Sequence, residues 1–287
     1  MKNRIIERID VEGDSLFYKI TGTGKPLILI PGAGGDGDLY LPLADELSKI
    51  FKVITYDRRA NARSTMNNPN NFDIKQQARD VKAILEATQE KKAYIFGNSS
   101  GAIIALEFIK NFPDSVLGAI IHEAPVAKLH DNSQKWCSFF KKCYDASFKI
   151  GGSSWSATKF LLGIEVPAMQ MIKAQIKATK YLKNELKTKE EKKIASKDAS
   201  KFLIRQELLP ITNYDVDIES LKKHSNKIVV AVGDYAKTKE SFLYNISVNL
   251  ANVLNSKLVI VPGHHGSFMD NEKEWAKALN NIIDSLN

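Results

Sequence analysis

Short apolar runs alternate with amphipathic stretches along the first 125 residues. A turn at Glu12-Gly13-Asp14 predicts a β-hairpin between strands at Ile5–Val11 and Leu16–Thr21. Further buried runs predict strands at Leu27–Ile30, Val53–Tyr56, Ala93–Phe96 and Val116–Ile121. Helical spacing of apolar positions between them predicts helices over Leu39–Ile50, Asp73–Glu86 and Ala102–Phe112. This alternation is typical of an α/β fold with a mostly parallel sheet.

The pattern changes between residues 126 and 225, where helical periodicity continues without a convincing strand. One helical face carries the apolar residues Ile172, Ile176, Thr179, Leu182 and Leu186, and most of the other carries Lys173, Lys177, Lys180, Lys183 and Lys187. Strands resume at Ile228–Val232 and Leu258–Val261, before a last helix through Trp275 and Leu286. We therefore expect an α/β core of residues 1–125 and 226–287, interrupted by a helical cap of residues 126–225.

The chain has 287 residues, of which 44% are hydrophobic, so it can bury a core without disulfides or structural metals. Its two cysteines, Cys137 and Cys143, suit neither a zinc site nor a disulfide framework. No apolar run is typical of a signal peptide or long enough to span a membrane. We expect a cytoplasmic protein, and no motif implies a metal or an organic cofactor.

The strongest chemical motif is Gly97-Asn98-Ser99-Ser100-Gly101, which has the form G-x-S-x-G. A predicted strand precedes it and a predicted helix follows it, which is the context of a nucleophile elbow. Such a turn exposes the hydroxyl of Ser99 above the sheet, and the backbone N–H of Ser100 points toward a developing oxyanion. The motif therefore predicts a nucleophilic serine at Ser99.

A nucleophilic serine needs a base and a carboxylate that orients the base. His264 and His265 lie together in a glycine-rich loop after the last strand, and their residue type alone does not separate them. Two acids are candidates for the carboxylate. Asp234 follows the strand at Ile228–Val232, whereas Glu123 follows the strand at Val116–Ile121.

A glycine-rich loop, Pro31-Gly32-Ala33-Gly34-Gly35, follows the strand at Leu27–Ile30. In a hydrolase the backbone N–H of Ala33 would be the second oxyanion donor. The same loop also matches G-x-G-x-x-G, and Asp57 ends the next strand, as in a dinucleotide-binding fold. That alternative is disfavoured because a hairpin precedes the loop, and because it leaves Ser99 and the paired histidines unexplained.

The order of these motifs resembles the α/β-hydrolase superfamily along almost the whole chain. The stretch Tyr56-Asp57-Arg58-Arg59-Ala60-Asn61-Ala62-Arg63-Ser64 resembles the family pattern YDRRGxGxS, with alanines in place of both glycines. A closer resemblance is to bacterial fluorophosphonate-binding serine hydrolases, which carry IPGxxG, DRR, GxSSG, HEPP and PGGHxGY in that order. The matching residues here include His122-Glu123-Ala124-Pro125 and Pro262-Gly263-His264-His265-Gly266. This resemblance implies that His265 is the base and Glu123 the acid.

The resemblance implies a carboxylic ester hydrolase with a small-molecule substrate and a Ser99-His265-Glu123 triad. The alternatives are C–C bond hydrolysis, an amidase or lactonase that uses the same residues, and a non-catalytic small-molecule binder. Cap exchange in related proteins makes a homodimer possible. Candidates for an acyl pocket in the cap are Phe139, Phe140, Trp155, Phe160, Leu161, Leu162, Met169 and Met171.

The distribution of charge adds a further expectation about partners. Residues 126–225 hold 19 Lys or Arg and 11 Asp or Glu, which accounts for the whole net charge of +8, because the remaining residues hold 22 of each. No basic motif of a nucleic-acid reader accompanies this excess, so we expect no nucleic-acid partner. The cap is either a solvated basic face or a surface for anionic lipid.

Overall fold

The computed structural model describes residues 4–67, 72–186, 191 and 199–286; Lys187 and part of the segment predicted as a cap therefore lie outside the described residues. Eight strands form one sheet in the order β1-β2-β4-β3-β5-β6-β7-β8. Their bounds are β1 Arg4–Val11, β2 Asp14–Thr21, β3 Lys25–Ile30, β4 Phe51–Tyr56, β5 Ala93–Asn98, β6 Val116–His122, β7 Ile228–Gly233 and β8 Lys257–Val261. The pairs of β2 with β1 and β4 are antiparallel and all others are parallel, which confirms the predicted fold class.

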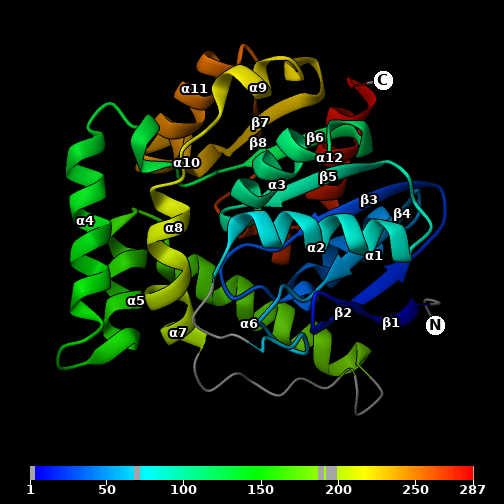
Figure 1. Cartoon of the computed structure of the whole chain (residues 1–287), viewed down its shortest axis with the longest axis horizontal. Coiled ribbons are helices and arrows are strands. Elements are labelled where there is room, and N and C mark those ends of the chain that lie inside the picture. Colours follow the sequence, from blue (N-terminus) through cyan, green and yellow to red (C-terminus); the bar gives the residue numbers. More distant parts are fainter. Residues whose placement is uncertain (1–3, 68–71, 187–190, 192–198, 287) are drawn as a thin grey trace.

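Helices cover the two faces of the sheet (Figure 1). The side chains of α2 (Ile74–Ala87), α3 (Ser100–Asn111) and α11 (Phe242–Leu254) pack into one buried cluster with the sheet. Those of α1 (Leu41–Leu47) and α12 (Glu272–Asp284) pack into a second cluster on the other face. The short α10 (Asp234–Thr238) directly follows β7. Each face of the sheet is thus buried, as its near-continuous apolar strands require.

The segment between β6 and β7 contains helices and, among its described residues, no strand. We call them the inserted helices: α4 Ser133–Ala146, α5 Gly152–Gly163, α6 Ala168–Glu185, α7 Ala199–Phe202, α8 Leu208–Thr212 and α9 Ile218–Lys222. Figure 1 shows α4, α5 and α7 to one side of the sheet, with α6 running beneath it. A π-helical turn, Leu203–Glu207, joins α7 to α8. This helical insertion after the sixth strand is the one that the sequence predicts.

Two local predictions differ from the structure. The helix expected over Leu39–Ile50 is shorter, because a 3₁₀ turn occupies Gly37–Tyr40 and α1 ends at Leu47. The sequence pattern also missed α11, whose apolar residues are spread widely around the helix because much of it is buried. No helix in the described part of the chain is both long and apolar enough to cross a membrane.

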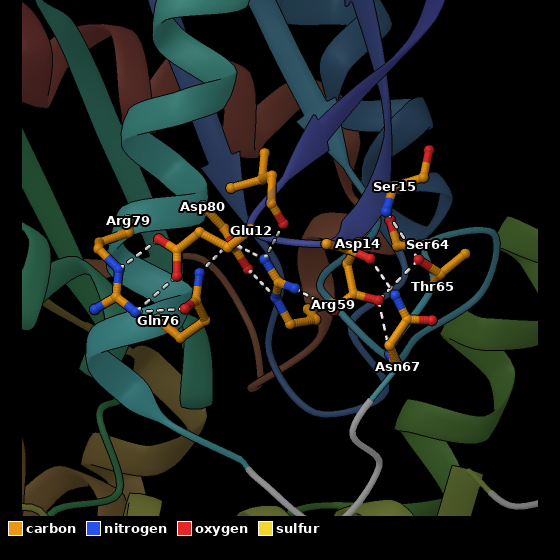
Figure 2. A network of polar contacts seen from close by, with 12 residues as sticks. Glu12, Asp14, Ser15, Arg59, Ser64, Thr65, Asn67, Gln76, Arg79 and Asp80 are labelled. Carbon is orange, nitrogen blue, oxygen red and sulfur yellow. Dashed lines mark hydrogen bonds and ion pairs between the residues drawn. The ribbon is translucent and has the colours of Figure 1, made fainter.

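A network around Arg59 ties the hairpin to the helical layer (Figure 2). Arg59 donates to both carboxylate oxygens of Asp80 on α2, at 2.9 and 2.6 Å, and pairs with Asp14 at the start of β2. It also donates to the backbone oxygen of Val11 at 3.1 Å. This network fixes the loop after β4, which carries Arg58 toward the candidate site.

Candidate active site

Ser99 occupies the sharp turn between β5 and α3. Its backbone has φ 55° and ψ −120°, a strained conformation for a residue with a side chain. The flanking glycines permit the turn because the chain is crowded there. A Cβ atom on Gly97 would lie 2.5 Å from the Gly101 oxygen, and one on Gly101 would lie 2.1 Å from the Ile30 oxygen. The local geometry is that of a nucleophile elbow.

Of the two histidines, His265 is the one that meets a carboxylate. It lies in the loop after β8, and its Nδ1 forms a short hydrogen bond with Oε2 of Glu123. Glu123 follows β6 with a φ of 50°, and its second oxygen accepts the Gly233 N–H at 2.9 Å. Both oxygens of this fully buried carboxylate therefore form hydrogen bonds. These contacts fix the carboxylate beside Nδ1 of His265.

The surroundings of Glu123 favour its ionised form. Burial alone favours the protonated acid. The neighbouring imidazoles of His122 and His265, together with the hydrogen bonds from His265 and the Gly233 amide, outweigh burial and lower the pKa of Glu123 to about 2. A carboxylate that is charged at neutral pH can orient an imidazole and stabilise an imidazolium.

Sequence reasoning did not assign a role to His122, which packs beside Glu123. Tyr40 donates to Oδ1 of Asn98 at 3.3 Å, and Nδ2 of Asn98 lies 2.8 Å from Nδ1 of His122. His122 Nδ1 is therefore an acceptor, so the proton of the neutral ring is on Nε2, which lies 3.7 Å from Oε1 of Glu123. Complete burial lowers the pKa of His122 to about 4. The only signal in the sequence was its position next to Glu123.

The alternative candidates, His264 and Asp234, are placed differently. His264 is buried, its N–H donates to Oγ of Ser267 at 2.7 Å, and its Nδ1 accepts the Gly266 N–H at 3.2 Å. Burial lowers the pKa of His264. Asp234 is exposed in the first turn of α10. The structure thus brings Glu123, and not Asp234, to the ring of His265.

Ala33 and Ser100, whose backbone amides the sequence predicts as oxyanion donors, both lie near Ser99. Ala33 and Ser99 line the same cavity, and Ser100 begins α3. Among the described residues, neither the Ala33 N–H nor the Ser100 N–H donates a backbone hydrogen bond. The carbonyl of Gly32, in the same peptide unit as the Ala33 N–H, accepts from Nη2 of Arg58 at 2.8 Å.

Asp57, the acid of the dinucleotide-binding alternative, is occupied by partners within the protein. Its Oδ1 accepts the Gly37 N–H at 3.0 Å, and Arg63 donates to both of its oxygens at 2.6 and 2.9 Å. The carboxylate is completely buried. It therefore holds the glycine loop in place and does not face a ribose.

A cavity of about 510 Å³ contains Ser99 and His265 at its polar end. The rest of its wall is largely apolar, and the segment between β6 and β7 contributes Phe160, Leu161, Leu162, Ile164, Met171, Ile172 and Leu203. Four of the eight acyl-pocket candidates, Phe160, Leu161, Leu162 and Met171, are in this wall. Phe139 and Phe140 instead pack with Trp136 in an aromatic cluster. A largely apolar cavity beside a few polar groups is typical of a small-molecule site.

Comparison with known proteins agrees with this architecture. A family model described as the alpha/beta hydrolase fold matches residues 25–145. The uncharacterized hydrolase YraK of Bacillus subtilis is 27% identical over 282 residues, which cover 96% of this chain and 95% of YraK. Its similarity therefore extends through the inserted helices as well as the sheet.

Solved structures with low sequence identity share the fold. A thermophilic esterase from Thermogutta terrifontis superposes with a TM-score of 0.71 at 18% identity, covering 99% of each chain. The enol-lactonase of Burkholderia xenovorans has a TM-score of 0.70 at 16% identity, covering 97% of this chain and all of the other. Together with the sheet order and the family-model match over residues 25–145, these similarities show that the chain has the α/β-hydrolase fold.

Proposed function

We propose that this protein is a serine hydrolase that cleaves carboxylic esters through Ser99, His265 and Glu123. One observation carries the proposal: Ser99 and His265 line the same cavity, while the hydrogen bond of Glu123 to Nδ1 of His265 leaves Nε2 of that ring available. The resemblance to fluorophosphonate-binding serine hydrolases supports the same set of residues. We further propose that the inserted helices act as a cap over Ser99.

In this mechanism Oγ of Ser99 attacks the acyl carbon of the ester while His265 takes its proton. The negative charge that develops on the carbonyl oxygen is bound by the N–H groups of Ala33 and Ser100. His265 then gives the proton to the departing alcohol, which leaves an acyl group on Ser99. Water, deprotonated by His265, attacks the acyl carbon, and the acid product leaves as Ser99 recovers its proton.

Glu123 contributes through His265 in both steps. Its carboxylate accepts a hydrogen bond from Nδ1, so the ring presents a basic Nε2 to Ser99. When Nε2 takes the proton, the charged carboxylate stabilises the imidazolium. The N–H of Gly233 keeps the carboxylate in place during both changes.

The decisive experiment combines a fluorophosphonate probe with the Ser99→Ala variant. We expect the probe to label the wild type covalently and the variant not at all, because the phosphonate forms its bond with Oγ. The variant is also expected to lose ester turnover while keeping its thermal unfolding profile. Labelling of the variant, or turnover by it, would overturn the assignment of Ser99.

The apolar cavity predicts how turnover depends on the acyl chain. Each methylene that enters an apolar site contributes roughly 0.8 kcal/mol, so kcat/KM is expected to rise about threefold to fourfold per added methylene until the cavity is filled. A panel of chromogenic acyl esters of increasing length tests this. A probe-labelled protein that cleaves lactones or amides but none of these esters would favour the alternative chemistries.

A further inference from the structure

Large exposed apolar side chains are concentrated on the inserted helices. Of the eleven in the described residues, eight lie between positions 148 and 176: Phe148, Ile150, Trp155, Leu161, Leu162, Met169, Ile172 and Ile176. The exposed fractions reach 61% for Leu162, 68% for Met169 and 63% for Ile176. Such concentration on a protein with an otherwise ordinary surface marks an interaction site.

Helix α6 presents these side chains on one continuous face. Ala174 and Ala178 are completely buried against the core, and Met169, Ile172 and Ile176 lie on the opposite face. The apolar face predicted from the sequence is therefore turned outward at Ile172 and Ile176. Small alanines, rather than large aliphatic residues, form the inner face because they let α6 approach α1 closely.

Lysines border the apolar stripe of α6. Lys173, Lys180 and Lys183 are exposed next to it by helical spacing, and none forms an ion pair with a carboxylate among the described residues. Across α5 and α6 there are five lysines and a single acid, Glu185, which bonds to Arg4 at 3.1 Å. An apolar stripe with a basic margin is complementary to the surface of an anionic bilayer.

The apolar surface continues into the cavity of Ser99. Leu161, Leu162 and Ile172 are exposed to solvent and also line the cavity wall. Helix α5 adds Trp155 and Lys159, which share a helical face with Leu162. An amphiphile resting on this surface would therefore reach the polar end of the cavity along an apolar path.

We propose that the exposed faces of α5 and α6 form a peripheral docking surface for an anionic phospholipid bilayer. The apolar stripe enters the boundary between head groups and acyl chains, and the lysines contact the phosphates. A second copy of the chain fits less well, because a two-fold interface would bring two sets of unpaired lysines together. The proposal concerns binding, so its test does not depend on the ester-hydrolase assignment.

Trp155 supplies an intrinsic reporter for the test. It is 59% exposed, whereas the other two tryptophans, Trp136 and Trp275, are buried. We expect a blue shift of tryptophan emission and co-sedimentation with vesicles of phosphatidylglycerol, weakened by added salt, and little of either with phosphatidylcholine. Equal binding to both vesicles, or no binding to the anionic ones, would overturn the proposal.

Variants distinguish binding through the docking surface from attraction by the overall positive charge of the protein. The pair Lys173→Gln with Lys180→Gln is expected to weaken partitioning into anionic vesicles about tenfold. Met169→Ser with Ile176→Ser is expected to weaken it by a similar factor. The control pair Lys222→Gln with Lys223→Gln removes the same charge at the end of α9 and is expected to change binding less than twofold.

All three double variants are expected to keep the thermal unfolding profile and the turnover of a soluble short-chain ester, because none of the six residues lines the cavity. If the control pair weakened binding as much as the α6 pairs, attraction would come from overall charge and the docking surface would be wrong. If the Met169 and Ile176 pair instead converted a dimer to a monomer without changing vesicle binding, the face would be a contact between copies, which also contradicts the proposal.

Discussion

Arg58 and Glu207 form a buried ion pair across 149 positions of the sequence, with Nη2 of Arg58 2.7 Å from Oε1 of Glu207. The same Nη2 donates to the Gly32 oxygen. Glu207 ends the π-helical turn between α7 and α8, and such turns occur frequently at functional sites. One guanidinium thus joins the inserted helices to the peptide whose N–H, at Ala33, is the proposed oxyanion donor.

This relationship predicts that stability and turnover respond differently to substitution. Glu207→Gln leaves the Arg58 cation buried without a counter-charge, so we expect a loss of about 3 kcal/mol in the free energy of unfolding. The double variant Arg58→Met with Glu207→Leu removes both charges and is expected to recover most of that loss.

Turnover is not expected to recover with stability. Without Arg58 the Gly32 carbonyl keeps the Gly35 N–H at 3.0 Å but loses the second of its two donors. The Ala33 N–H of the same peptide is then held less firmly, so we expect kcat to stay roughly tenfold to a hundredfold below wild type in the double variant. Urea unfolding and single-ester kinetics measure the two effects. Wild-type kcat in the double variant would confine Arg58 to a role in stability.

The assignment of the acid predicts an asymmetric response at two positions. Glu123→Gln removes the charge beside His265 and disturbs the tautomer of its ring, so we expect kcat to fall by about three to four orders of magnitude. Asp234→Asn changes an exposed side chain at the start of α10 and is expected to alter kcat less than threefold. The opposite pattern in steady-state kinetics would exchange the roles of these two acids.

The loop after β4 contains two alanines in a backbone conformation that favours glycine. Ala60 has a φ of 69° and Ala62 a φ of 47°, at the two positions where the family pattern YDRRGxGxS has glycine. We expect Ala60→Gly and Ala62→Gly each to raise the free energy of unfolding by about 0.5–1 kcal/mol, because the relieved strain exceeds the added chain entropy. Thermal or urea unfolding measures it.

A matched substitution in ordinary helix tests the cause of that effect. Ala83 lies within α2 with an ordinary helical backbone and is partly buried against the core. Glycine there adds chain entropy and removes a methyl contact without relieving strain, so Ala83→Gly is expected to lower stability by about 1 kcal/mol. Destabilisation by glycine at positions 60 and 62 as well would show that the positive φ angles are not a source of strain.

The sequence was sufficient to predict the sheet and the sharp turn at Ser99, because both depend on local patterns. Buried strands read as apolar runs, and the elbow needs small residues at fixed spacing around Ser99. Residue types alone could not decide whether Glu123 or Asp234 is the acid that contacts His265. It depends on the backbone after β6, where Glu123 adopts a positive φ and donates its N–H to Ala231 at 3.2 Å.

Sequence patterns also could not predict contacts between segments that are far apart in the chain. Periodicity grouped Ile172 and Ile176 on one face of α6 but did not say which face is buried, since the inner contact is made by Ala174 and Ala178. The pairing of Arg58 with Glu207 joins the loop after β4 to a π-helical turn that no pattern predicted. Tertiary packing, rather than local preference, decides each of these features.

Burial of His122 predicts that the stability of the protein depends on pH in acid solution. Its pKa is lowered from 6.5 to about 4 by desolvation, although Glu123 nearby favours protonation and His265 opposes it. Between these two values the unfolded chain binds a proton on this ring and the native protein does not. The free energy of unfolding therefore falls as the pH falls from about 6.5 to 4, and this one group contributes about 3 kcal/mol to the decrease.

The variant His122→Asn removes this titrating ring and, with it, one of the groups that lower the pKa of Glu123. The asparagine side-chain oxygen replaces Nδ1 as the acceptor for Asn98, and it does not titrate, so the variant is less stable than wild type at neutral pH because the ring is lost. The difference in unfolding free energy between wild type and variant, measured by urea unfolding from pH 7.5 to 4, is expected to shrink by about 3 kcal/mol. His264, whose pKa burial also lowers, is present in both proteins and cancels from the difference. A difference that stays constant over this range would mean that His122 takes up its proton in the native state as readily as in the unfolded chain.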